Sequence, residues 1–274
     1  NIWGREGEQC VIPVHMVLTM MGGKNMELEG FSERLMRHLD FIEYRRIETQ
    51  EDFEDIEQLR YKTYKAADMI PRSAPSMIDE ADFDPHAYVF GIYYFEELVS
   101  TIRLHHVTPD HRLSQSAQVF PDIMESYLDA GLTIIDPARF AVDPAFAAEV
   151  PVLPYITLRP SIVAAAYFKA DRVLQPVRPA HAAFYKRVFY AETVVDRRMT
   201  EIYGRELTLM ATNTHTTGTK LLKRYPFFDS GVHERRLMFG RGVGPLPTTP
   251  LTILPSARLV ADGKITGAIA GRDY

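Results

Sequence analysis

Apolar and polar positions follow two different periods along the middle of the chain. Residues 41–48 alternate as a half-buried strand does, and residues 50–67 have apolar side chains at the spacing of a helix. Two further apolar runs, separated only by Glu96 and Glu97, predict a hairpin. In the same way, the pattern predicts strands at residues 87–95, 98–106, 132–142, 172–177 and 206–211, and helices at residues 120–130, 154–170, 180–192 and 216–224.

The order of these elements predicts an α/β fold, of the mixed α+β kind, in which helices flank one central mixed sheet. The composition changes only near the end, where residues 240–255 are rich in glycine, proline and threonine, as a linker is. We therefore expect an N-terminal arm at residues 1–40, one folded domain at residues 41–240, and a linker and tail at residues 241–274.

One apolar stretch, residues 10–21, lies outside this domain. A membrane-spanning helix needs about 20 apolar residues, and this shorter stretch is interrupted by Pro13 and His15. Acidic residues precede it, which argues against a signal peptide. We interpret it as a buried strand or as part of the arm, and we expect a cytoplasmic protein without a membrane span.

The composition excludes several classes of protein. Of the 274 residues, 46% are hydrophobic and 24% are charged, so disorder, collagen and a coiled coil are excluded as the main state. The 36 acidic and 31 basic residues give a net charge of −5, which argues against nonspecific binding to nucleic acid. The single cysteine, Cys10, excludes an intramolecular disulfide and a cysteine-based zinc site. His105 and His106 are adjacent and would point to opposite faces of a strand, so we expect no bound metal.

Four short motifs follow one another within the predicted domain. Each combines a charged residue with an aromatic or aliphatic one. They are Arg60-Tyr-Lys-Thr-Tyr64, Asp82-Phe-Asp84, Thr101-Ile-Arg103-Leu104 and Asp136-Pro-Ala-Arg139-Phe140. Together they resemble the motifs of the acyl-homoserine lactone synthases and of the related N-acyl amino acid synthases. A later segment, Phe184-Tyr185 followed by Val188-Phe189, resembles the part of GNAT acyltransferases that has an aromatic-tyrosine pair and then Gly-Phe.

This resemblance implies a GNAT-like acyltransferase fold for residues 41–240. It implies an N-acyltransferase that moves a long-chain fatty acyl group from a thioester to an amino group and that has no bound cofactor. At the catalytic centre it places Asp136, Tyr185 and Arg139. The substrate-binding residues that it implies are Arg60, Tyr64, Asp82, Asp84, Arg103 and Phe140.

The chain differs from the lactone synthases at three points. Asp136 takes the place of their glutamate, Ala138 takes the place of a serine, and the tryptophan near the acidic stretch is missing, since Trp3 is the only tryptophan. These differences favour an N-acyl amino acid synthase, which uses a free amino acid. A lactone synthase, which uses S-adenosylmethionine, is the alternative.

A further difference concerns the acyl donor. GNAT enzymes that use acetyl-CoA have a glycine-rich loop after the corresponding strand, and its backbone N–H groups bind the pyrophosphate of CoA. Residues 143–154 contain no glycine. This favours acyl carrier protein, with the acyl group on its phosphopantetheine, as donor and partner. Either a docking face for this acidic partner or an ordinary solvated surface could be formed by Arg172, Arg178, Lys186, Arg187, Arg197, Arg198, Lys220, Lys223 and Arg224.

Amide formation from a thioester needs a base for the substrate ammonium group and an acid for the departing thiolate. Asp136 is the candidate base, although it could equally be only the buried ion-pair partner of Arg103 or Arg139. Tyr185 is the candidate acid by resemblance, and a tyrosine of the core is the alternative. Arginines suit the carboxylate of an amino acid, because a guanidinium group binds both oxygens. The acidic stretch at residues 79–84 could instead be a solvated loop.

The leading hypothesis is therefore an acyl-carrier-protein-dependent synthase of long-chain N-acyl amino acids. The first alternative is an acyl-homoserine lactone synthase with the same fold. The second belongs to another class and is a catalytically silent module that binds acyl carriers or lipids.

Overall fold

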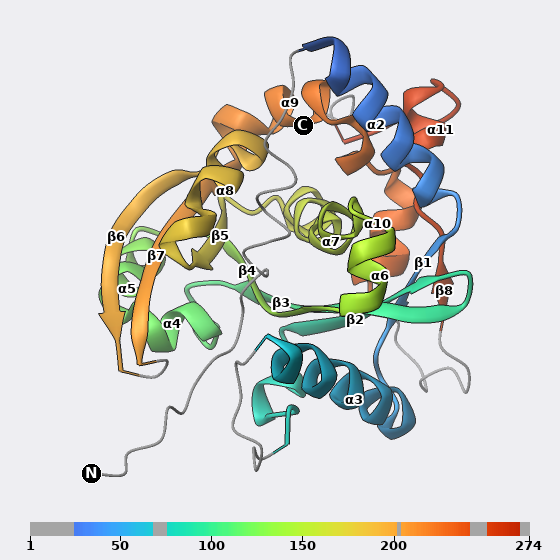
Figure 1. The fold of residues 1–274 in the computed structure, drawn as a ribbon. Helices are drawn as coiled ribbons and strands as arrows, with labels where there is room; N and C mark the ends of the chain where they lie inside the picture. Colours follow the sequence, from blue (N-terminus) through green and yellow to red (C-terminus); the bar gives the residue numbers. More distant parts are fainter. Residues whose placement is uncertain (1–24, 68–75, 202–203, 242–250, 269–274) are drawn as a thin grey trace.

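The computed structural model describes residues 25–67, 76–201, 204–241 and 251–268 (Figure 1). Within these ranges, eight strands form one sheet in the order β6-β7-β5-β4-β3-β2-β1-β8. Among the described strands, only β4 and β5 are parallel neighbours, so the sheet is mixed as predicted. The strands are β1 (Ile42–Arg46), β2 (Ala87–Tyr94), β3 (Glu97–Val107), β4 (Ile134–Val142), β5 (Arg172–Val177), β6 (Glu192–Thr200), β7 (Arg205–Asn213) and β8 (Thr252–Ile253).

Helices cover both faces of this sheet (Figure 1). The helix α7 packs on β3, β4 and β5 from one side, and α3 packs on β3 and β4 from the other. The helices α4 and α5 lie on the same side as α3. The α-helices are α2 (Asn25–Leu39), α3 (Gln50–Ala66), α4 (Gln115–Val119), α5 (Pro121–Asp129), α6 (Pro144–Glu149), α7 (Leu153–Phe168), α8 (Ala182–Phe189), α9 (Thr214–Arg224), α10 (Val232–Phe239) and α11 (Ala257–Ala261), and the 3-10 helices are η1 (Glu80–Asp82), η2 (Pro179–His181) and η3 (Pro226–Phe228).

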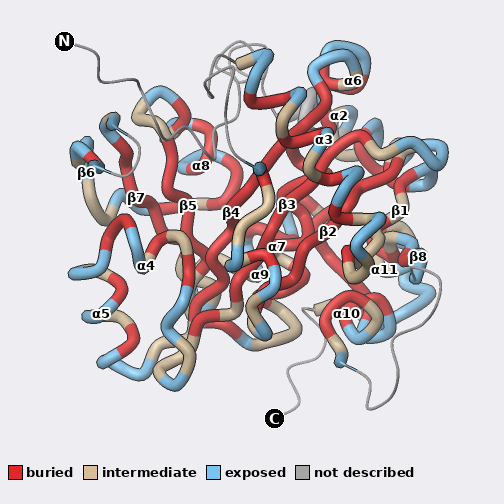
Figure 2. The backbone as a smooth tube through the Cα atoms, turned by 90° about the horizontal axis from the view of Figure 1, so that it is seen from below, coloured by how far each residue is buried: buried red, intermediate tan, exposed pale blue. Residues whose placement is uncertain are grey.

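The core follows the central strands, as Figure 2 shows by the buried colour of the tube. The strand β4 is buried at every one of its nine positions. Strands that are covered on both faces normally have nearly continuous apolar sequences. Asp136 and Arg139 break this rule in β4, so two ionisable groups lie in the middle of the protein.

The predicted strands and helices between β1 and α9 are confirmed with one correction, whereas the short helices α4 and α6 were not predicted. The helix predicted at residues 180–192 ends at Phe189, because Tyr190 has a left-handed backbone conformation with φ of 53°. The residues that follow form β6, which the sequence analysis did not predict. Most side chains of this edge strand are exposed or only half-buried, so no regular apolar alternation marks it.

The two predicted flanking segments also contain structure. Residues 25–39 of the expected arm form α2, whereas the apolar stretch at residues 10–21 lies outside the described residues. In the expected linker and tail, β8 pairs with β1, with Ile253 opposite Tyr44. None of the helices in the described ranges is long and apolar enough to cross a lipid bilayer.

A buried ion pair attaches the C-terminal helices to the rest of the domain. Arg159 of α7 is fully buried and pairs with Glu234 of α10, with its Nη2 3.0 Å from Oε2. Arg159 also donates from Nε to the backbone carbonyl of Phe227 at 2.7 Å. The carboxylate of Glu234 in turn accepts from the backbone N–H of Ser256 at 2.9 Å. One buried carboxylate therefore connects α7, α10 and the segment that leads into α11.

Candidate active site

A β-bulge in β4 decides how the charged residues of this strand are arranged. The register between β3 and β4 shifts between Thr101 and Arg103, where β4 has one residue more than β3. Arg139 lies in this stretch and has a φ of 53°, which residues other than glycine rarely adopt. Bulges and strained residues of this kind occur preferentially beside active sites, where they redirect a side chain.

The bulge brings Asp136 and Arg139 to one face of the sheet. In a regular strand, residues three positions apart point to opposite faces. Here Asp136 accepts hydrogen bonds from Ser116 of α4, and Arg139 pairs with Asp79 just before η1, so both side chains lie on the side of α3 and α4. Phe140, by contrast, joins the apolar core beneath α7.

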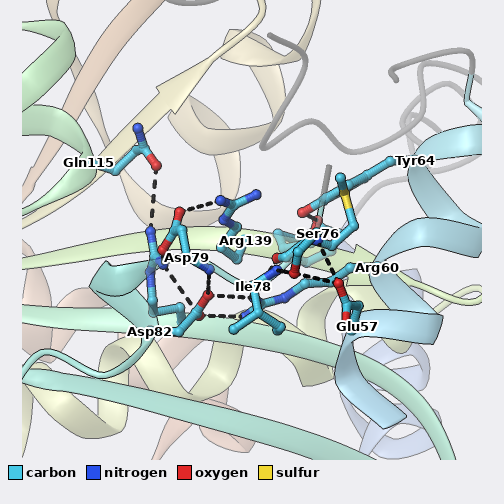
Figure 3. A network of polar contacts seen from close by, with 12 residues as sticks. Glu57, Arg60, Tyr64, Ser76, Ile78, Asp79, Asp82, Gln115 and Arg139 are labelled. Atoms are coloured by element: carbon cyan, nitrogen blue, oxygen red, sulfur yellow. Dashed lines mark hydrogen bonds and ion pairs between the residues drawn. The ribbon is translucent and has the colours of Figure 1, made fainter. Parts of the chain in front are cut away.

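Three arginines and two aspartates meet on the α3 side of β3 and β4. We call them the arginine–aspartate cluster, which consists of Arg60, Arg103, Arg139, Asp79 and Asp82. Four of them, Arg60, Arg139, Asp79 and Asp82, are labelled in Figure 3. Arg60 of α3 is fully buried and binds both carboxylate oxygens of Asp82, each at 2.9 Å. Its Nη1 also donates to the backbone carbonyl of Met77 at 3.1 Å. The pair of Arg60 and Asp82 thus holds the segment around η1 against α3.

Asp79 connects the other two arginines of the cluster. One of its oxygens lies 2.6 Å from Nη1 of Arg103, and the other accepts a hydrogen bond from Arg139. Burial by itself would raise the pKa of Asp79, but the two guanidinium groups outweigh it and lower this pKa to about 2. The side chain of Asp79 is 39% exposed, so the cluster is open to solvent at this carboxylate.

Arg139 has two hydrogen-bond donors for which the described residues provide no acceptor. Its side chain is buried, yet neither Nε nor Nη1 has a hydrogen-bond partner among the described residues. A buried donor without a partner costs free energy, and such groups call for an explanation. In the cluster three guanidinium groups pair with only two carboxylates. A further carboxylate beside Arg139 would neutralise the remaining positive charge and accept hydrogen bonds from the unpartnered nitrogens of Arg139.

Asp136 lies on the same face but is held by α4 instead of by an arginine. Its two oxygens accept from the backbone N–H and the hydroxyl of Ser116, each at 2.7 Å. Burial raises the pKa of Asp136, although the hydrogen bonds from Ser116 oppose this shift. Within the described residues, the ion pair with Arg103 or Arg139 that the sequence allowed is not formed. A buried carboxylate with a raised pKa has the property expected of a general base.

His105 lies directly opposite Asp136 in the register of β3 and β4. The ring is fully buried, and neither ring nitrogen has a hydrogen-bond partner in the described part of the chain. Burial, together with the neighbouring Arg103, lowers the pKa of His105 to about 4. A neutral imidazole therefore faces the carboxylate of Asp136 at neutral pH.

A narrow, mostly apolar cavity of about 30 Å³ lies where β4 and β5 separate. These strands pair at only two positions, which begin at Ile134 and Arg172, and then diverge. Phe140, Tyr185 and His181 line the cavity. The Nε2 atom of His181 has no partner among the described residues, and burial lowers the pKa of this histidine to about 4.

The structure separates other predicted site residues from the cluster. Tyr185 lies on the α7 side of the sheet, whereas Asp136 lies on the α4 side. Asp84 is engaged elsewhere, because it pairs with His111 at 2.9 Å. Tyr64 of α3 donates its hydroxyl to the backbone carbonyl of Phe140 at 3.3 Å, so it adjoins the bulge.

Sequence reasoning did not single out Asp79, Ser116 or His181 as site residues. A signal for Asp79 was present, because it precedes Asp82 by three residues, and that spacing on a helical turn puts both carboxylates on one side. No local signal marks Ser116, whose contact with Asp136 depends on the packing of α4 against β4. His181 becomes relevant only because β4 and β5 diverge beside it.

The family model of the N-acyl amino acid synthase FeeM matches residues 55–213, which are more than half of the chain. The chain belongs to this family. As a member of the FeeM family the protein is an acyltransferase, and the resemblance derived from its motifs is confirmed. The matched region contains the whole arginine–aspartate cluster and the cavity between β4 and β5.

Solved structures agree with the expected GNAT-like fold, which is confirmed. The structure of FeeM, from uncultured soil microbes, aligns with a TM-score of 0.54 and 15% sequence identity over 67% of this chain and 96% of that chain. The CoA-dependent acyl-homoserine lactone synthase BjaI aligns at 0.47, with 13% identity over 67% and 89% of the two chains. The ribosomal-protein-S18-alanine N-acetyltransferase of Escherichia coli aligns at 0.41, with 11% identity over 63% and 93%. No curated protein sequence matches the chain.

Proposed function

We propose that this FeeM-family acyltransferase moves a long-chain fatty acyl group from acyl carrier protein to the α-amino group of a free amino acid. The product is an N-acyl amino acid. The observation that supports the acceptor most strongly is the pair of unpartnered, buried nitrogens on Arg139, next to the half-exposed Asp79. The α-carboxylate of an amino acid is the group that an arginine in this state binds well.

In this proposal Asp136 removes a proton from the ammonium group of the acceptor. The raised pKa of this buried carboxylate brings its basicity closer to that of an amine, which makes the transfer easier. The hydrogen bonds from Ser116 keep the carboxylate in one orientation. The neutral ring of His105 across the strand pair adds no competing positive charge.

The cavity between β4 and β5 is the candidate site for the thioester. Backbone N–H groups on diverging strands are free to bind the developing oxyanion of an acyl transfer. Tyr185 lines this cavity on the face of the sheet opposite to Asp136, and it is the candidate acid for the departing thiolate. A volume of about 30 Å³ accommodates little more than a water molecule, so the acyl chain enters only when α8 and the two strands move apart.

The segment after β4 supports a carrier-protein donor. The helix α6 begins with Pro144, which has no N–H, and the carboxylate of Asp143 caps it by accepting from the N–H of Ala145 at 2.9 Å. Asp143 is also 2.5 Å from Nζ of Lys62. A carboxylate thus occupies the helix terminus where a pyrophosphate would need free N–H groups.

The exposed cations of α8 and α9 support the same donor. These two helices are neighbours, and both have basic residues in their last turn. A carrier protein with an acidic surface would find complementary charge there. The exposed basic side chains are Lys186, Arg187, Lys220, Lys223 and Arg224.

The test is acylation by the purified chain, with mass spectrometry of the products. The reactions contain a mixture of amino acids and either acyl-acyl carrier protein or the same acyl group on CoA. We expect N-acyl amino acids with the carrier protein, and loss of at least about 100-fold in rate for Asp136→Asn, which is the usual contribution of a general base. The matched control is Asp122→Asn, which removes an exposed carboxylate and leaves the rate unchanged.

Three outcomes contradict parts of this proposal. If no donor yields a product, the acyl-transfer assignment itself is wrong for these substrates. If S-adenosylmethionine is consumed and a lactone forms, the acceptor is wrong. If Asp136→Asn has full activity, Asp136 is not the general base, and the other parts of the proposal are unaffected.

A further inference from the structure

A second, larger cavity lies away from the candidate active site. It is a groove of about 700 Å³ at the end of α7 that leads into β5, and α9 and α10 form its other walls. No described residue lines both this groove and the cavity between β4 and β5. A volume of this size is typical of sites for small ligands.

Much of the groove belongs to the part of the chain beyond the family match. That match ends at residue 213, whereas α9, α10 and Ala268 follow it. The buried pair of Arg159 and Glu234 holds α10 against α7, so the two walls have a defined spacing. Most of the groove's lining residues therefore lie outside the region that the family model matches.

The groove contains a largely buried arginine whose guanidinium group has no partner among the described residues. Arg235 is only 9% exposed and lines the groove, and its side chain forms no hydrogen bond or ion pair with any described residue. The nearby acids are engaged with other groups. Asp229 accepts from the backbone N–H of Ala268, and Glu234 accepts from Arg159.

The electrostatics of the groove favour a negative ligand. Burial lowers the pKa of Arg235, although Asp229 and Glu234 oppose the shift. Arg236 and Lys169 line the same groove, and none of the described residues that line it is acidic. A bound carboxylate or phosphate would give Arg235 the partner that the fold does not provide.

Part of the groove's lining is apolar. It includes Ala165, Ala166 and Ala170 of α7 and its end, together with Leu222 of α9. An alkyl chain could lie along these apolar side chains. An anionic group at Arg235 and an apolar wall beside it are the two features that an amphipathic anion recognises.

Gly218 keeps the groove open from the side of α9. It lies inside this helix, where glycine lowers helix stability relative to alanine. Its backbone has no positive φ, and a Cβ atom placed on it would contact nothing within 4 Å. Neither the backbone nor the packing therefore requires glycine here, and the space beside it is part of the groove.

We propose that this groove binds an amphipathic organic anion, with its carboxylate or phosphate on Arg235 and its alkyl part against the alanines of α7.

Titration calorimetry on the full chain tests this with three probes of equal chain length: decanoate, decyl phosphate and decanol. We expect at least one anion to bind at least tenfold more tightly than decanol, because only an anion pairs with Arg235. The tighter of the two anions identifies the charged group as carboxylate or phosphate. If neither anion binds, or if decanol binds as tightly, the proposal is wrong.

Variants assign the binding to the groove. We expect Arg235→Gln to weaken binding at least tenfold, and Gly218→Leu to weaken it by occupying part of the groove. Gly218→Ala is the matched control, since it adds only a methyl group, keeps the affinity and raises the melting temperature. Unchanged binding to Gly218→Leu would place the anion elsewhere and overturn the proposal, and this comparison decides the question even if Arg235→Gln does not fold. Calorimetry measures ligand binding and not acyl transfer. A failure of the proposed function would therefore leave the proposal for this groove unaffected.

Discussion

Arg60, Arg103 and Arg159 are among the largest side chains that the fold buries completely. Each is paired with a carboxylate from a distant part of the sequence: Arg60 and Arg103 with the segment at η1, and Arg159 with α10. A buried guanidinium group loses most of its hydration, so removing its partner is far more harmful than removing a surface partner. Each of these ion pairs therefore holds together two elements that are distant in the sequence.

The pair of Arg60 and Asp82 gives a test of this view. Asp82→Asn leaves the buried charge of Arg60 uncompensated, and we expect the free energy of unfolding to fall by about 3–5 kcal/mol. Urea denaturation followed by circular dichroism measures this change. The control is Asp122→Asn, which breaks a similar two-pronged pair with Arg198 at the surface and should cost about 0–1 kcal/mol. Equal losses for the two variants would contradict the argument.

At the scale of elements, β4 and the turn before it position the site. The strand would have Asp136 and Arg139 on opposite faces without its bulge, and the cluster could not form. The start of β4 is set by the end of α5, where the N–H of Gly131 donates to the carbonyl of Leu128 at 3.0 Å and its φ is 80°. A left-handed residue at this position is the common way to end a helix.

Two glycine substitutions separate backbone conformation from packing. Gly131→Ala places a side chain on a left-handed residue, and we expect a loss of about 1–2 kcal/mol in the free energy of unfolding. Gly30→Ala, in α2, should instead gain about 0.5–1 kcal/mol, because its backbone is helical. A Cβ atom would contact nothing within 4 Å at either site, so packing does not differ. Thermal or urea unfolding of both variants measures the sign of each change in stability. A gain in stability at both positions would show that alanine adopts the backbone conformation of residue 131 without strain.

At the scale of the whole molecule, helices on both faces of the sheet enclose titratable groups in the interior. His105 lies on the α4 side of the sheet and His181 beside the cavity at β5. Burial lowers the pKa of both to about 4, so both rings are neutral in the folded protein at neutral pH. The unfolded chain, in which histidine has a pKa of about 6.5, binds these protons more readily.

The sign of the pH dependence follows from this difference. Because the unfolded state binds more protons between about pH 6.5 and 4, stability is greatest above this range and is lost as the pH falls through it. Each histidine contributes up to about 1.4 kcal/mol per pH unit within the range. Melting temperatures from pH 7.5 to 4.5 measure the slope. His105→Leu should reduce it, and the exposed His215→Leu serves as the control. An unchanged slope for His105→Leu would contradict the prediction.

The sequence by itself determined most of the fold. Apolar periodicity is a local property of each segment, so the strands and helices from β1 to α9 could be predicted in their order. The same local signal fails at β6, whose side chains are largely exposed, and at β8, which is only two residues long. The motifs also identified Asp136 and every member of the arginine–aspartate cluster except Asp79, because their residue types and order resemble those of the family.

Only the tertiary structure decided which of these charged groups meet. A single extra residue in β4 moves Arg139 to the face of Asp136, and no periodicity reveals a one-residue bulge. Asp79, and not Asp84, bridges the arginines, while Asp136 is held by Ser116. These partners are tens of positions apart in sequence, and their contacts depend on how α3, α4 and the sheet pack together. Local patterns therefore specify the elements, whereas the pairing of buried charges is specified only when those elements come together in three dimensions.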